Sequence, residues 1–148
     1  RSPVRFVAAK DSDLDVSPEG LAGKIIGVQA GTVYEPWLSD NYTESEIRAY
    51  PTVDEHNADL LSGRIDLIIG DALALLGGFL ETDDGEAYEF VGPDLTDPAL
   101  VGDGIGIAVR QGEDELREAL NTAIATIREN GTYAEINARY FAIDIYGE

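Results

Sequence analysis

The apolar segment 65–70 constrains the fold more than any other part of the chain. It reads Ile-Asp-Leu-Ile-Ile-Gly and ends at Asp71, so it is a nearly continuous apolar run of strand length. Such runs are typical of strands buried on both faces of a parallel sheet, because a strand with one wet face alternates apolar and polar residues. We therefore expect a sheet with helices on both sides.

Further strand-like runs alternate with helical segments along the chain. Strands are predicted at 4–9, 24–29, 46–50, 88–91 and 105–109, and helices at 32–41, 52–63, 72–80, 113–130 and from 132 onward. Three Thr-x-x-Glu tetrads, beginning at Thr32, Thr52 and Thr132, match capping boxes with Thr as the N-cap. Gly131 is expected just after the helix that ends at Asn130. Short connections between strands and helices predict a mainly parallel α/β sheet.

Composition narrows the class of protein. The 148 residues, 44% of them hydrophobic, are enough for one soluble domain with a core, and no run approaches the roughly 20 apolar residues that span a bilayer. The net charge of −19 repels phosphate backbones, so nucleic acid is not an expected partner. The chain starts at Arg1 without a methionine or a signal peptide, which reads as a processed product or a fragment.

Two side chains at predicted strand ends could hold the two charged ends of an amino acid. Thr32 offers a hydroxyl and free backbone N–H groups at a helix start, which favour a carboxylate. Asp71 follows the buried strand and could accept a ligand ammonium. Each has a plain alternative as a helix N-cap, and this choice stays open. In open parallel sheets ligands bind beyond the carboxyl ends of the strands, where both residues fall.

Catalytic, metal and cofactor sites are not expected. The chain has no cysteine, and its one histidine, His56, is predicted at an exposed helical position where it can build neither a metal site nor a triad alone. The segment 27–32 faintly resembles a phosphate loop but lacks the lysine. Gly102, Gly104 and Gly106 precede a strand, so they suit a hinge better than a dinucleotide site. We therefore predict a binding protein rather than an enzyme.

Several motifs resemble one known family, the periplasmic solute-binding proteins for polar amino acids. The likeness is closest to the branch that binds histidine or lysine, arginine and ornithine, with opine binders nearby. The motifs occur in the family's order over essentially the whole chain: Leu21-Ala22-Gly23-Lys24, Ile26-Gly27-Val28-Gln29-Ala30-Gly31-Thr32, Gly63-Arg64-Ile65-Asp66 running to Asp71, Gly104-Ile105-Gly106-Ile107-Ala108-Val109, Glu115-Leu116-Arg117-Glu118-Ala119-Leu120-Asn121, Asn130-Gly131-Thr132-Tyr133, Arg139-Tyr140-Phe141 and Asp144-Ile145-Tyr146-Gly147.

The resemblance implies a two-lobe α/β fold of the type II periplasmic binding proteins. Residues 3–101 would form a complete second lobe, and the hinge crossover would comprise Gly102, Asp103 and Gly104. Residues 105–148 would belong to the first lobe, whose N-terminal part is absent from this sequence. The family's two lobes close on a ligand and then dock on a membrane ABC permease.

The resemblance also implies ligand-binding residues and partners. Thr32 and the backbone of Val33 would bind the ligand's carboxylate, Asp71 its α-ammonium, and Gln29 would border its side chain. Relatives carry an aliphatic residue at Gln29 and polar residues at Val33 and Tyr34, so the choice among lysine, arginine, ornithine, histidine and an opine stays open. The intact protein is expected to be periplasmic and monomeric and to need no cofactor or metal.

Two alternatives share the same fold. One is an enzyme similar to the cyclohexadienyl or arogenate dehydratases, which would need an acid or base in the cleft beyond Asp71. The other is a ligand-sensing domain of a larger receptor. Fold analogy alone does not choose among these functions.

Overall fold

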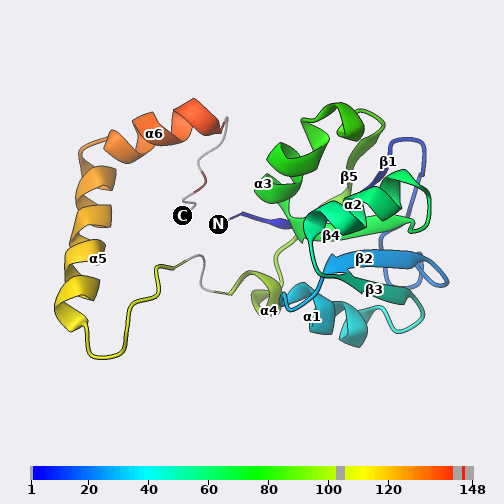
Figure 1. Cartoon of the computed structure of the whole chain (residues 1–148), viewed down its shortest axis with the longest axis horizontal. Coiled ribbons are helices and arrows are strands. Elements are labelled where there is room, and N and C mark those ends of the chain that lie inside the picture. Colours follow the sequence, from blue (N-terminus) through cyan, green and yellow to red (C-terminus); the bar gives the residue numbers. More distant parts are fainter. Residues whose placement is uncertain (1, 103–105, 142–144, 146–148) are drawn as a thin grey trace. The chain divides into compact units, whose positions relative to one another are not determined.

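A computed structural model of the chain describes residues 2–102, 106–141 and 145. The chain divides after Gly102 into two compact units, and the larger one is formed by Ser2–Gly102. Figure 1 shows the elements of each unit coloured along the sequence. Among the described residues, no helix combines the length and the apolar character needed to cross a membrane.

The larger unit is built on a five-stranded sheet of order β3-β2-β4-β1-β5. Its strands are β1 (Val4–Ala9), β2 (Ile25–Gln29), β3 (Glu46–Tyr50), β4 (Leu67–Asp71) and β5 (Tyr88–Leu95). β2 pairs in parallel with β3 and β4, as expected, whereas β1 is antiparallel to both β4 and β5. The expected α/β class is confirmed, but the expectation of a mainly parallel sheet was wrong around β1, because hydrophobic patterning reports burial and carries no information on strand direction.

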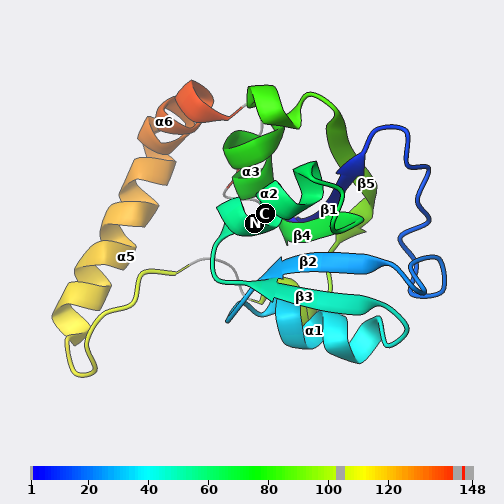
Figure 2. The ribbon, with the colours of Figure 1, turned by 45° about the vertical axis from the view of Figure 1, so that its right-hand side comes forward.

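Helices cover both faces of this sheet. They are α1 (Tyr34–Asn41), α2 (Val53–Leu61) and α3 (Ala72–Leu75), which continues into a π-type turn (Leu76–Leu80); a 3-10 turn (Asp83–Gly85) and α4 (Pro98–Val101) complete the unit. Figure 2 shows α1 and α2 on opposite sides of β2 and β3. Side chains alternate between two cores, as Phe6 packs with Leu38 of α1 on one face and Val7 packs with Leu60 of α2 on the other. Both faces of the sheet are therefore buried, as the 65–70 run predicts.

The three predicted capping boxes had different outcomes. The Thr52 hydroxyl accepts a hydrogen bond from the Glu55 N–H at 3.3 Å, which confirms Thr52 as the N-cap of α2. The prediction for Thr32 was wrong, because its hydroxyl donates instead to the Gln29 carbonyl at 2.7 Å and α1 begins only at Tyr34. Thr132 lies inside its helix rather than at the N-cap.

The smaller unit contains two helices among its described residues, α5 (Asp114–Glu129) and α6 (Thr132–Tyr140). Gly131 lies between them with a left-handed backbone (φ 84°), in the predicted position just after α5. The strand predicted at 105–109 is not formed over its described part, 106–109. A strand needs a hydrogen-bonding neighbour, and the described residues provide none here.

Phe6 tests how far the larger unit depends on its sheet core. Its side chain is fully buried and its ring meets the Tyr42 ring edge-on at a centroid distance of 5.7 Å. Phe6→Ala should lower the free energy of unfolding by about 3–5 kcal/mol, because a large cavity replaces the ring. Leu61→Ala is the control, since Leu61 is 41% exposed and should cost far less. Urea unfolding of both variants measures the difference, and equal losses would contradict the assigned core.

Candidate functional site

A cavity of about 220 Å³ lies at the carboxyl ends of β2 and β4, within the larger unit. Parallel strands end at the same edge of a sheet, so the pairing of β2 with β4 brings Gln29 and Asp71 to this edge. Helices α2 and α3 supply most of the remaining wall. The lining residues are Gln29, Thr32, Tyr34, Val53, His56, Asn57, Ile69, Gly70, Asp71, Ala74, Leu75, Gly78 and Phe79.

Asp71 caps helix α3 and lines the cavity at the same time. One carboxylate oxygen, Oδ1, accepts the N–H groups of Leu73 and Ala74, each at 3.0 Å. The N-cap alternative of the sequence analysis is therefore correct. Oδ2 makes no hydrogen bond within the described part of the chain, so it remains available to a cation. Capping and ligand binding are compatible because they use different oxygens.

The β2–α1 turn exposes donors of the kind that bind anions. Within the described residues, the backbone N–H groups of Thr32 and Val33 donate no hydrogen bond, whereas the Gly31 N–H is taken by the Glu35 carboxylate at 3.1 Å. The Thr32 hydroxyl donates its proton to the Gln29 carbonyl, so towards a ligand it can act only as a hydrogen-bond acceptor. The backbone, more than the hydroxyl, is therefore suited to a carboxylate.

The structure brings together three of the four predicted ligand-binding residues. Gln29, Thr32 and Asp71 line one cavity, whereas Val33 is 53% exposed and is not among the lining residues. Tyr34, which the sequence analysis noted only as a departure from relatives, also lines the cavity. Burial, and then the negative charge of nearby Asp71, raise the pKa of its phenol. Tyr34 therefore contributes a neutral hydroxyl to the site.

The predicted exposure of His56 was wrong. It was predicted to be exposed, but it is 1% exposed and lines the cavity from helix α2. Its ring meets the Tyr50 ring edge-on at a centroid distance of 6.2 Å. Burial lowers the pKa of His56, with smaller opposing effects from Asn57 and Asp54. The i, i+4 spacing from His56 to buried Leu60 could have placed it on the buried face.

The predicted hinge is only partly described. Gly102 has a backbone conformation (φ 50°, ψ −150°) that side-chain-bearing residues avoid, which explains a glycine at this point. Asp103 and Gly104 lie outside the described residues.

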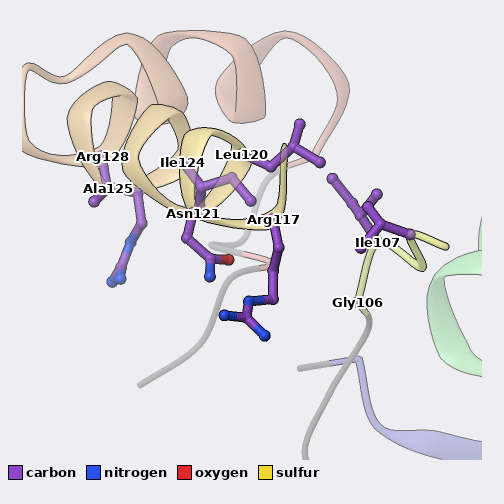
Figure 3. A pocket seen from close by; sticks show the side chains of 9 residues that line it. Gly106, Ile107, Arg117, Leu120, Asn121, Ile124, Ala125 and Arg128 are labelled. Atoms are coloured by element: carbon purple, nitrogen blue, oxygen red, sulfur yellow. The ribbon is translucent and has the colours of Figure 1, made fainter. Parts of the chain in front are cut away.

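A second cavity of about 320 Å³ lies within the smaller unit, along one side of α5. Figure 3 shows its lining side chains on this helix and on the segment from Gly106. Leu120 and Ile124 give it an apolar wall, and Arg117 is paired with Asp114 at 3.0 Å. The described residues that line this cavity include no carboxylate, so they do not match both ends of a zwitterion. Across the described residues, no cluster of potential metal ligands occurs.

His56 should make stability depend on pH. As the pH falls below about 6.5, the unfolded chain takes up a proton at this histidine that the folded chain resists, so the free energy of unfolding decreases. His56→Leu should lack this dependence. Urea unfolding between about pH 8 and pH 5 measures it, since carboxylates with lowered pKa values, such as Asp59, release their contribution at lower pH. Parallel pH profiles for the two proteins would contradict the burial of a neutral His56.

Comparison with known proteins places the sequence among solute-binding proteins. The profile of the bacterial extracellular solute-binding proteins, family 3, matches residues 1–143. The L-arginine-binding protein of Pseudomonas aeruginosa is 41% identical over 148 residues, which is 99% of this chain and 57% of that protein. The histidine-binding periplasmic protein of Escherichia coli K12 is also 41% identical, over 97% of this chain and 56% of its own length. The chain thus spans little more than half of each relative.

Solved structures agree with this assignment. An ancestral arginine-binding protein bound to glutamine matches with a TM-score of 0.81 and 28% identity, over 96% of this chain and 60% of that one. This likeness confirms the expected type II periplasmic-binding-protein architecture.

Proposed function

We propose that this chain, which belongs to the bacterial extracellular solute-binding proteins of family 3, is part of a receptor that binds a free basic amino acid or an opine. The receptor would deliver its ligand to an ABC permease from the periplasm. Both relatives reported above are named as binding proteins, which supports a binding role over the dehydratase-like alternative. The chain would supply the second lobe of the receptor.

One feature of the cavity carries the proposal. Within the described residues, one carboxylate oxygen of Asp71 makes no hydrogen bond, and the backbone N–H groups of Thr32 and Val33 donate none. These groups occur at the ends of neighbouring parallel strands. A free amino acid carries an ammonium and a carboxylate on adjacent carbons, so it can use both features at once. Gln29 would then border the ligand's side chain, as the resemblance implies.

The charge balance favours a basic side chain. Among the described residues, the cavity lining contains Asp71 but no lysine or arginine. The whole chain carries a net charge of −19, which attracts cations over a distance of about 8–10 Å at moderate ionic strength. An acidic ligand would gain neither benefit.

The second lobe alone should bind weakly. A micromolar ligand needs about 8 kcal/mol of binding free energy. A helix N-terminus contributes roughly 0.3–1 kcal/mol and a charged hydrogen bond about 1.5–3 kcal/mol, before entropic losses. Contacts from a first lobe would supply the rest, with residues 105–148 belonging to that lobe. Closure would turn about the crossover at Gly102, Asp103 and Gly104, and the intact receptor would act as a monomer.

Asp71→Asn tests the proposed ammonium contact. The amide oxygen of asparagine can still cap α3, so the variant should fold, but the negative charge that binds the ligand is gone. The affinity for arginine of the natural gene product, the full-length protein to which this chain belongs, should fall roughly tenfold to hundredfold, because a charged hydrogen bond is lost. Calorimetric titration measures the change.

Asp97→Asn provides the matched control. Asp97 is also an N-cap aspartate, with its oxygens bonded to Ala99 N–H and Trp37 Nε1, each at 2.8 Å, and it does not line the cavity. This variant should leave arginine affinity unchanged. Equal effects of the two substitutions, or none from Asp71→Asn, would refute the assigned role of Asp71.

A further inference from the structure

His56 is a polar side chain enclosed in the wall of the cavity. It is 1% exposed and lines the cavity that Asp71 and Thr32 also line. Around it the wall is largely apolar, with Val53 on the same helix and Leu75 on α3. A buried polar ring without partners costs free energy, so its presence in this wall calls for a partner.

The two ring nitrogens of His56 differ in their surroundings. Nδ1 is fully buried and has no hydrogen-bond partner, and neither does the buried side-chain oxygen of neighbouring Asn57. Nε2 also makes no hydrogen bond within the described residues, yet it is not among their fully buried unpartnered atoms. The small accessible part of the ring therefore includes Nε2, and His56 is one of the residues that line the cavity.

The surroundings favour an imidazole that accepts a hydrogen bond at Nε2. Burial lowers the pKa of His56, so the ring is neutral at neutral pH and carries one N–H. The Asn57 side chain favours a proton on the ring, and because Nδ1 and the Asn57 oxygen are both buried without a partner, we assign that proton to Nδ1. Nε2 then presents a lone pair. Nearby carboxylates at Asp54 and Asp71 and the Tyr50 phenol make the region favourable for a cation.

We propose that His56 determines the ligand's side-chain specificity by accepting, at Nε2, a hydrogen bond from a cationic N–H group of the ligand. The assignment rests on the proposed function, because it concerns the same cavity. Asp71 would hold the α-ammonium, and His56 would recognise the ammonium or guanidinium at the far end of the side chain. A ligand without a donor at that end would leave Nε2 unpaired.

Lysine and norleucine isolate this contact, because norleucine is lysine without its terminal amino group. Calorimetry would measure both affinities for the natural gene product, for His56→Leu and for His56→Gln. His56→Leu should lower the preference for lysine over norleucine roughly tenfold to hundredfold, because lysine loses the contact with Nε2 and norleucine no longer leaves Nε2 unpaired. His56→Gln should keep part of the preference, because the glutamine oxygen can accept the same bond.

The outcomes separate the two proposals. An unchanged preference in His56→Leu would overturn the role of His56 while leaving the amino-acid receptor intact. If the natural protein binds no basic amino acid and no opine, the proposed function itself fails, and the role of His56 fails with it.

A spectroscopic test avoids variants altogether. The 148-residue chain contains one histidine, so ¹⁵N-labelled histidine gives the ring signals of His56 alone. Long-range ¹H–¹⁵N spectra should show the proton on Nδ1 and should show the Nε2 signal shifting on addition of lysine but not of norleucine. A proton on Nε2, or the same response to both ligands, would overturn the proposal.

Discussion

The parallel pairing of β2 with β4 is the constraint on which the candidate site depends. Because both strands run in the same direction, their carboxyl ends meet at one edge, and the chain leaves that edge through the turn at Thr32 and through Asp71. Helices on both faces of the sheet bury these strands and fix their ends. The site therefore consists of strand ends held in place by the core.

Asp71 shows how one residue can serve both folding and binding. Its Oδ1 caps α3 with two hydrogen bonds, which fixes the direction of the carboxylate, and Oδ2 has no partner in the part of the chain that the structure describes. A preorganised carboxylate loses little conformational entropy when a ligand binds. The sequence left open whether Asp71 is a helix N-cap or a ligand-binding residue, and the two roles are compatible. Its contact with a ligand stays a prediction.

The sequence predicted the strands and helices of the larger unit better than their local contacts. The apolar run before Asp71 correctly indicated a doubly covered sheet, and Thr52 correctly marked the start of α2. The prediction of Thr32 as an N-cap failed because a hydroxyl can donate as well as accept, and this one donates to the Gln29 carbonyl. The prediction that His56 is exposed was wrong because it relied on the polarity of histidine and overlooked the i, i+4 spacing to buried Leu60. The prediction of a strand at 105–109 failed because strand formation depends on a neighbouring strand that the local sequence does not reveal.

Calorimetric titration of the natural gene product with free amino acids tests the central claim most directly. The ligands are lysine, arginine, ornithine and histidine, compared with glutamine and glutamate at the same pH and ionic strength. We predict saturable binding of at least one basic ligand, with glutamate binding weakest, because Asp71 is the only charged side chain among the described residues that line the cavity. Tight binding of glutamate in preference to every basic ligand would contradict it.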